Sequence, residues 1–206
     1  MDQPSQNEHK PMSVICQQLE SLLKRSELDN RPVALMTCGV AGAGKSTLAK
    51  AVTQKFPTFQ HVSIDGILAS RHGLVGVDYL RSDYDNYQDE AGTVFLAIVG
   101  QVLDEGNNDL VLDRSFYAKE DREFFKSCVE QHGGRWVLVY LKAPKEVLWH
   151  RICARREAEI NADSALEISR DLLDTYFDGF EMPNGEGELA IRTHPVDALF
   201  GPVPNQ

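Results

Sequence analysis

The sequence lacks the features that mark disulfide-stabilised, cysteine–metal or membrane-spanning proteins. Its 206 residues contain four cysteines, with no CxxC pair among them: Cys16, Cys38, Cys128 and Cys153. Such scattered cysteines are typical of reduced thiols in a cytoplasmic protein. No apolar run approaches the roughly 20 residues of a membrane span, and residues 1–11 have no apolar signal core. We therefore expect a cytoplasmic protein with no membrane partner, in which residues 1–11 form a flexible tail.

Basic residues are also scarce. Lys and Arg number 21 against 31 Asp and Glu, which gives a formal net charge of -10. A surface this acidic repels a phosphate backbone, so we expect no long nucleic acid as a partner, although a local basic pocket for one small anion remains compatible. The expected partner is a small-molecule substrate, and a monomer and a homodimer both remain open.

Short apolar runs alternate with amphipathic segments along the chain. The patterns predict strands over 33–38, 61–65, 110–113, 135–141 and 187–193. They predict helices over 12–28, 45–56, 85–105, 119–132, 144–160 and 164–178, whereas 66–84 shows no clear period. This alternation predicts right-handed βαβ crossovers and hence an α/β fold, a parallel sheet with helices on both faces. We expect one domain over residues 12–206.

A glycine-rich loop follows the first predicted strand. Residues 39–46, GVAGAGKS, fit the pattern G-x-x-x-x-G-K-[ST]. Its glycines let backbone N–H groups turn toward phosphate oxygens, the following helix adds its positive end, and Lys45 adds a full charge. Ser46 is placed to bind Mg²⁺. The candidate cofactor-binding residues are Gly39, Ala41, Gly42, Ala43, Gly44, Lys45, Ser46 and Thr47.

A dinucleotide-binding loop is the other interpretation of these glycines. It requires Gly or Ala where Thr47 stands, although Asp65 lies about twenty residues downstream, where a ribose-binding acid would be. The Lys45–Ser46 pair favours a nucleoside triphosphate.

Two acids follow apolar runs. Asp65 ends the second predicted strand and Asp113 ends the third. The carboxyl ends of parallel strands meet at one edge of the sheet, beside the glycine loop. One acid can accept a proton from an attacking hydroxyl, and the other can hold Mg²⁺ through water. For either acid alone, a helix cap or a turn remains an alternative.

Three arginines lie close together in RICARRE. Arg151 and Arg155 share a helix face, and Arg156 lies about 100° further round. They can neutralise charge on the transferred phosphate from a lid over about 145–180. The alternative is a solvated face, since acidic residues follow them. We predict a catalytic role for Arg155 and phosphate contacts for Arg151 and Arg156.

These pieces together resemble a known family. The segments GVAGAGKST, SIDGI, LVLDRSF, RICARRE and FEMP…GELAI, within about residues 33–193, are similar to the small P-loop kinases related to polynucleotide kinase, zeta toxin, gluconate kinase and chloramphenicol phosphotransferase. The resemblance implies a P-loop kinase fold with a helical lid, ATP and Mg²⁺ as cofactors, and Asp65 as the base. It also implies that Asp113 supports Mg²⁺ or the acceptor, and that adenine packs between a lid arginine and the loop at 192–197.

The acceptor site should come from residues 68–90 and 114–122, which flank the two acids. Tyrosines offer flat walls, and arginines suit a carboxylate or phosphate. The candidate acceptor-binding residues are Asp65, His72, Tyr79, Arg81, Tyr84, Arg114 and Tyr117. For single members, a place in the core or on a solvated helix remains an alternative.

We therefore predict ATP- and Mg²⁺-dependent phosphoryl transfer to a hydroxyl of a small polar metabolite, with Lys45, Asp65, Asp113 and Arg155 as catalytic residues and Ser46 and Asp113 at the metal. Two alternatives remain open. One is a polynucleotide or nucleoside 5′-hydroxyl kinase, and the other is a nucleotide-binding regulatory ATPase without an acceptor.

Overall fold

The strands form a single parallel sheet of five strands in the order β2-β3-β1-β4-β5. The computed structural model describes residues 12–193. The strands are β1 (Val33–Cys38), β2 (Phe59–Ser63), β3 (Asp109–Asp113), β4 (Arg135–Lys142) and β5 (Glu188–Arg192). All neighbouring strands run parallel, which confirms the predicted α/β class.

The central strands are apolar because helices cover both of their faces. Every residue of β1 and of β3 is buried. Thr37 is the polar exception within β1, and its hydroxyl donates to the carbonyl oxygen of Leu112 at 3.1 Å. Thr37 also stands opposite Asp113 in the register of the two strands. The carboxyl end of β3 therefore lies beside the loop that leaves β1.

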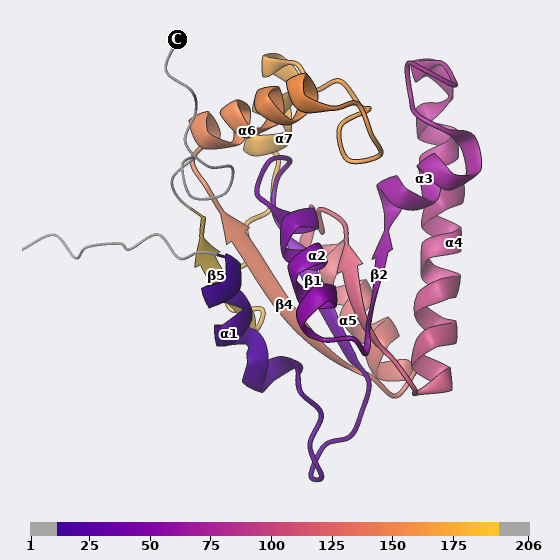
Figure 1. Ribbon diagram of the computed structural model, residues 1–206, viewed down its shortest axis with the longest axis vertical. Helices are drawn as coiled ribbons and strands as arrows, with labels where there is room; N and C mark the ends of the chain where they lie inside the picture. The colour runs from indigo at the N-terminus through magenta and orange to yellow at the C-terminus, as the bar shows by residue number, and fades with distance from the viewer. Residues whose placement is uncertain (1–11, 194–206) are drawn as a thin grey trace, which may run out of the picture.

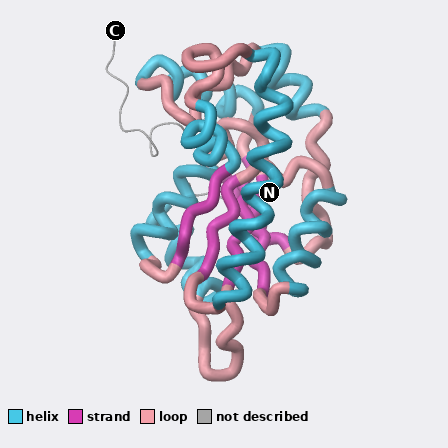
Figure 2. Tube along the Cα trace, turned by 90° about the vertical axis from the view of Figure 1, so that its right-hand side faces the viewer, coloured by secondary structure: helices cyan, strands magenta, loops and turns pink. Residues whose placement is uncertain are grey.

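Helices lie in two layers around the sheet and in a group beyond its carboxyl edge (Figures 1 and 2). The elements α1 (Met12–Leu23) and α2 (Lys45–Lys55) cover one face, and α4 (Tyr84–Glu105) and α5 (Lys119–Gln131) cover the other. The elements α3 (Ile64–His72), α6 (Lys145–Ala158) and α7 (Arg170–Asp178) lie at the carboxyl edge, and a short 3-10 turn, η1 (Arg81–Asp83), precedes α4. No helix between residues 12 and 193 is both long and apolar enough to cross a membrane.

The second strand differs from its prediction. It ends at Ser63, and Asp65 lies in the first turn of α3 instead of ending the strand. The Ser63 hydroxyl accepts a hydrogen bond from the Gly66 N–H at 3.2 Å, which caps the new helix. The segment 66–84 therefore contains most of a helix that the sequence pattern did not reveal, because α3 buries only Ile64 and Leu68.

Two predicted helices are too long. The first ends at Leu23 instead of residue 28, because a turn follows in which the Ser26 N–H donates to the Asp29 carbonyl at 3.0 Å. The second lid helix begins at Arg170 instead of 164, where the Ser169 hydroxyl caps it by accepting from the Leu172 N–H at 3.2 Å. Residues 159–169 form a loop, called the lid loop below.

Parts of the prediction fall outside the described residues. These are the tail at 1–11 and the portion of the adenine-binding loop beyond residue 193. The single domain over 12–206 stays a prediction.

Candidate functional site

The glycine loop joins β1 to α2 and has a backbone that side chains would disturb. Gly44 has φ +101°, in the left-handed region, and caps α2. Gly42 has φ +80°, and a Cβ there would lie 2.7 Å from the carbonyl oxygen of Leu148 on α6. The loop therefore passes too close to the lid helix for a larger residue at 42, and it presents the N-terminal end of α2 to the carboxyl edge of the sheet.

Arg151 is hydrogen-bonded to the backbone of this loop. Its guanidinium is buried and donates to the carbonyl oxygen of Gly42 at 3.3 Å and to the hydroxyl of Thr193 at 3.1 Å. The Thr193 hydroxyl in turn donates to the carbonyl oxygen of Ala43 at 3.3 Å. Arg151 thus braces the glycine loop against the end of β5, and its predicted contact with ATP stays a prediction.

Lys45 begins α2 and lies between the loop and the two acids. Its Nζ donates to the carbonyl oxygen of Val40 at 3.2 Å. The enclosing protein lowers the pKa of the Lys45 ammonium, while the negative charges of Asp113 and Asp65 oppose that change. The ammonium therefore lies within electrostatic reach of both carboxylates, as the phosphate-binding role requires.

Asp65 lies in the first turn of α3 and is exposed to solvent. Enclosure by the surrounding protein raises the pKa of the Asp65 carboxyl to about 6, and repulsion from Asp113 adds to the rise. The charges of Lys45 and Arg155 act in the opposite direction. A carboxylate with a pKa near 6 is still mostly ionised at neutral pH and accepts a proton more readily than an ordinary Asp.

Asp113 ends β3 in a buried position. Its Oδ2 lies 3.0 Å from Nε2 of His61 on β2, which leaves Oδ1 for another ligand. No cluster of three or more metal-binding side chains exists among residues 12–193. Mg²⁺ usually takes one or two protein oxygens and completes its shell with phosphates and water, so Ser46 and Asp113 fit a metal that arrives with a nucleotide.

The three lid arginines have different surroundings. Arg156 donates to the carbonyl oxygens of Ser164 and Ala165, each at 3.2 Å, and so braces the lid loop. Arg155 instead acts electrostatically on Lys45 and on Asp65. Its Nε is buried without a hydrogen-bond partner in the described part of the chain. Of the three, Arg155 is the one whose charge bears on both Lys45 and Asp65, and its catalytic role stays a prediction.

A small cavity adjoins Asp65, between α3, the segment at 73–84 and the lid loop. Figure 1 shows the chain after α6 extending toward α3. The cavity measures about 20 Å³, which is room for about one water molecule. Two predicted acceptor residues, Tyr79 and Tyr84, line it together with Asp65. The lid loop therefore lies close over the space in which an acceptor would meet Asp65.

His72 and Arg81 do not reach this cavity. The His72 ring stacks on Tyr87 with centroids 3.8 Å apart, and its Nε2 lies 3.1 Å from Glu90. Arg81 donates to Asp85 at 3.2 Å on the exposed surface. Both side chains are thus engaged with α4.

Arg114 and Tyr117 also lie apart from the cavity. Arg114 pairs with Asp121 at 3.0 Å and lies over the ring of Phe125. The Tyr117 hydroxyl donates to the carbonyl oxygen of Thr175 at 3.4 Å. The side chains that the sequence suggested for an acceptor anion are therefore held by other parts of the protein.

The sequence pattern did not predict the aliphatic wall of the cavity. Leu74 and Val75 line it from the segment after α3, and Ala162, Ala165 and Leu166 line it from the lid loop. Residues 164–166 lie in the lid loop, whereas the sequence pattern predicts a helix there. One sequence feature points to this wall. Leu74 and Val75 form an apolar pair between Gly73 and Gly76.

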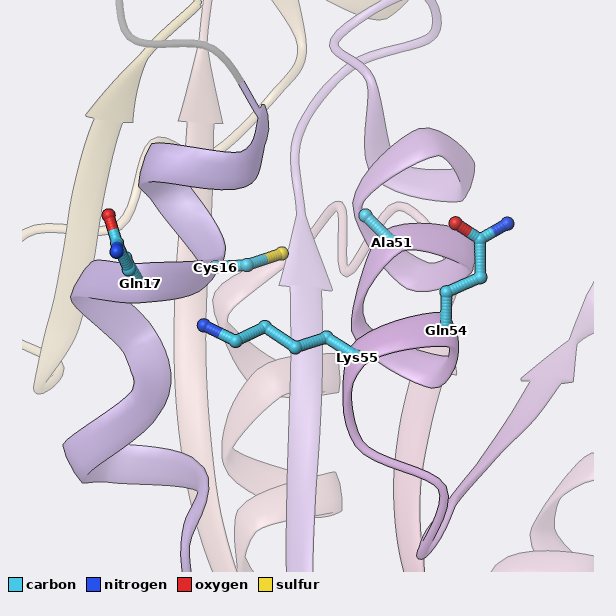
Figure 3. Close-up of a pocket in the computed structure, with 5 residues that line it drawn as sticks. All are labelled: Cys16, Gln17, Ala51, Gln54 and Lys55. Carbon is cyan, nitrogen blue, oxygen red and sulfur yellow. The ribbon is translucent and has the colours of Figure 1, made fainter.

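A larger hollow lies elsewhere, between α1 and α2 (Figure 3). Its volume is about 630 Å³, and Cys16, Gln17, Ala51, Gln54 and Lys55 line it. Burial raises the pKa of the Cys16 thiol, although the charge of Lys55 opposes the rise. The hollow follows the C-terminal half of α2, whereas the glycine loop lies at the other end of that helix, so it is not part of this site.

Three solved structures have the same fold. A protein of Chloroflexus aurantiacus is 18% identical over 79% of this chain and 88% of its own, with a TM-score of 0.64. A gluconokinase from Sinorhizobium meliloti is 19% identical over 80% of this chain and 85% of its own, with a TM-score of 0.55. A chain of the Pnkp1/Rnl/Hen1 RNA repair complex is 18% identical over 72% of this chain, with a TM-score of 0.59, and the match covers 44% of that chain. These likenesses confirm the predicted P-loop kinase fold.

The sequence itself matches a family. No curated protein is similar to it in sequence. The model of the family described as AAA domain matches residues 35–183, which contain the glycine loop, both acids and the lid arginines. Because this segment makes up most of the chain, the protein belongs to the AAA domain family of P-loop proteins.

Proposed function

We propose that the protein transfers the γ-phosphoryl group of Mg-ATP to a hydroxyl group of a small molecule. The observation that supports this most is the position of Asp65, which lies within electrostatic reach of Lys45 and also lines a separate cavity. An enzyme that only hydrolyses ATP has no need of a base facing a second cavity. A kinase needs one, because its base must meet the acceptor beside the γ-phosphate.

In the proposed reaction, Asp65 accepts the proton from the acceptor hydroxyl. The acceptor oxygen forms a bond to the γ-phosphorus, the bond from that phosphorus to the β–γ bridging oxygen breaks, and ADP leaves. The pKa of Asp65, about 6, keeps the carboxylate ionised at neutral pH and close to the optimum for a general base.

The positive groups of the site stabilise the charge on the transferred phosphate. Lys45 and the N-terminal end of α2 would hold the β- and γ-phosphates, and Arg155 would act on the γ-phosphate from the lid. Ser46 and Asp113 would hold Mg²⁺, which would supply further positive charge to the phosphates. His61 orients the Asp113 carboxylate through its contact of 3.0 Å.

The lid loop would keep water from the γ-phosphate. Asp163 of this loop pairs with Lys50 on α2 at 2.8 Å, and the loop walls the cavity beside Asp65. Exclusion of water suppresses hydrolysis and strengthens the electrostatic contacts inside. The exposed pair is weak enough to open for substrate entry.

The test measures ADP release from Mg-ATP, and label transfer from γ-³²P-ATP, over a panel of hydroxylated metabolites, nucleosides and short 5′-hydroxyl oligonucleotides. For an accepted substrate, Asp65→Asn should lower kcat by about 10²–10⁴-fold and leave the affinity for ATP unchanged. Asp89→Asn is the matched control, because Asp89 is exposed on α4 outside the site. Equal turnover of the wild type and Asp65→Asn would refute the proposal. ADP release that no member of the panel stimulates would favour a regulatory ATPase.

A further inference from the structure

The cavity beside Asp65 has an unusual composition for a kinase acceptor site that binds an anion. Asp65 is the one charged residue among those described as lining it. The walls are aliphatic or aromatic, and Leu68, Leu74, Val75 and Leu166 contribute to them. A carboxylate or phosphate placed there would lose its hydration without gaining a positive partner, which is costly.

The polar groups that the walls do offer are neutral. Apart from Asp65, the polar side chains among the lining residues are Tyr79 and Tyr84. Burial raises the pKa of both phenols, and the negative charge of Asp65 raises it further, so both stay protonated at physiological pH. Neutral hydroxyls recognise hydroxyl, ether or amide groups, and they do not balance a negative charge.

Three cations on the surrounding elements pair with acids that do not line the cavity. Arg81 pairs with Asp85, and its guanidinium lies 4.6 Å from the ring centre of Tyr84 on the outer side of the site. Arg114 pairs with Asp121 at 3.0 Å. Lys50 on α2 pairs with Asp163, whose negative charge also raises the pKa of Asp65. An anionic acceptor would meet the Asp65 carboxylate, with the negative charge of Asp163 nearby, whereas Lys45 and Arg155 lie on the side proposed to bind ATP.

We propose that the phosphoryl acceptor is an uncharged, mainly apolar alcohol. This inference rests on the proposed kinase function and identifies its substrate class. Because the closed cavity of about 20 Å³ holds about one water molecule, the lid loop must withdraw before the alcohol enters. The alcohol then places its apolar body against the aliphatic walls, its other polar groups against the two phenols, and its reacting hydroxyl at Asp65. Its O–H proton passes to Asp65 as the new O–P bond forms and ADP leaves. Sugar acids and 5′-hydroxyl polynucleotides, both anionic, are excluded on the same physical ground.

Matched acceptor pairs test the substrate class. The probes are 3-phenyl-1-propanol, 4-(hydroxymethyl)benzamide against 4-(hydroxymethyl)benzoate, adenosine against adenosine 3′-monophosphate, and glucose against gluconate. We expect phosphorylation of the neutral aromatic alcohols, with kcat/KM at least 100-fold above that of the benzoate. Preference for the anionic members would overturn the substrate class and leave the kinase function standing. Binding of Mg-ATP without stimulation by any probe, or by the metabolite panel above, would overturn both.

A charge placed in the cavity tests its location. Leu166→Lys should lower kcat/KM for 3-phenyl-1-propanol at least 10-fold and raise the relative use of 4-(hydroxymethyl)benzoate, while KM for ATP stays constant. Ile160→Lys is the control, because Ile160 lies in the same loop, is 47% exposed and does not line the cavity. Leu74→Lys, from the opposite wall, repeats the test if Leu166→Lys does not fold. Unchanged selectivity in both folded variants would overturn the proposal.

Discussion

Replacement of Glu186 by Ala should destabilise the protein strongly, because it isolates a buried charge. Arg122 is fully buried, and its guanidinium makes two hydrogen bonds to the Glu186 carboxylate, at 2.7 and 2.8 Å. The same guanidinium donates to the carbonyl oxygen of Phe116 at 2.9 Å. Phe116 has φ +46°, the one positive value outside glycine among the described residues. The pair therefore fixes the turn that follows Asp113, close to the candidate site.

The expected magnitude follows from this burial. Removal of one partner of a buried ion pair costs about 3–5 kcal/mol, because the other charge stays in the interior without compensation. In a chain of about 200 residues, 1 kcal/mol corresponds to roughly 2–4 °C in Tm, so Glu186→Ala should lower Tm by about 6–20 °C. A typical total stability is about 5–15 kcal/mol, so the variant should unfold at a clearly lower urea concentration.

Thermal and urea unfolding, followed by circular dichroism, measure the effect. Asp85→Ala is the control, because it breaks the exposed pair with Arg81 and should cost at most about 1 kcal/mol. The double variant Arg122→Met with Glu186→Leu should recover much of the loss, since it leaves neither charge buried. A Glu186→Ala protein that is no less stable than Asp85→Ala would refute the reasoning.

Three further predictions concern the lid arginines and Asp65. Arg155→Ala should lower kcat about 10²–10³-fold with little change in KM for ATP, whereas Arg156→Ala should mainly loosen the lid loop and reduce kcat less. Steady-state kinetics on both variants measures the difference. An unchanged kcat in Arg155→Ala would show that this arginine has no part in the mechanism. The pKa of Asp65 in the free protein, about 6, predicts that kcat/KM for the acceptor falls about tenfold per pH unit below pH 6 as the base becomes protonated. A profile of kcat/KM against pH that stays flat to pH 5 contradicts it. Because folding raises this pKa, ionisation of Asp65 opposes folding as pH rises from about 4 through 6. Asp65→Asn should therefore stabilise the nucleotide-free protein at pH 7, by less than about 1 kcal/mol, since solvent screens this exposed side chain. Urea titrations at pH 7 and at pH 4 check the sign of this effect.

Local patterns predicted the sheet and the glycine loop because the relevant information is contiguous in the sequence. β1 and β3 are buried throughout, so β1 is apolar apart from Thr37, and β3 is apolar between its two terminal acids. The loop pattern fixes the position of Lys45 relative to α2 within eight residues of sequence. The register then follows, since parallel neighbours place Asp113 beside the end of β1.

Other features depend on partners that no local sequence pattern identifies. Arg114 suggested an anion site, but Asp121 on α5 pairs with it. His72 suggested an acceptor contact, but Glu90 and Tyr87 on α4 engage its ring. Sequence identifies a polar side chain and not its partner, so it cannot separate a substrate ligand from a residue satisfied within the protein. The start of α3 was missed for a different reason, since its capping residue, Ser63, also ends a strand.

The contacts of the lid indicate which part of it can move. The body of α6 is anchored, because Leu148 packs against Gly42 and the buried Arg151 donates to the glycine loop and to Thr193. The lid loop is attached to α2 through an exposed pair, Lys50 with Asp163. Breaking buried hydrogen bonds costs more than opening an exposed ion pair. The hydrogen bonds of Arg156 to the carbonyl oxygens of Ser164 and Ala165 also hold the loop to α6, so these bonds must break as well before the loop withdraws from the cavity. Arg155, on the anchored helix, can keep its position near Lys45 and Asp65 meanwhile, so acceptor entry need not disturb the phosphate-binding groups.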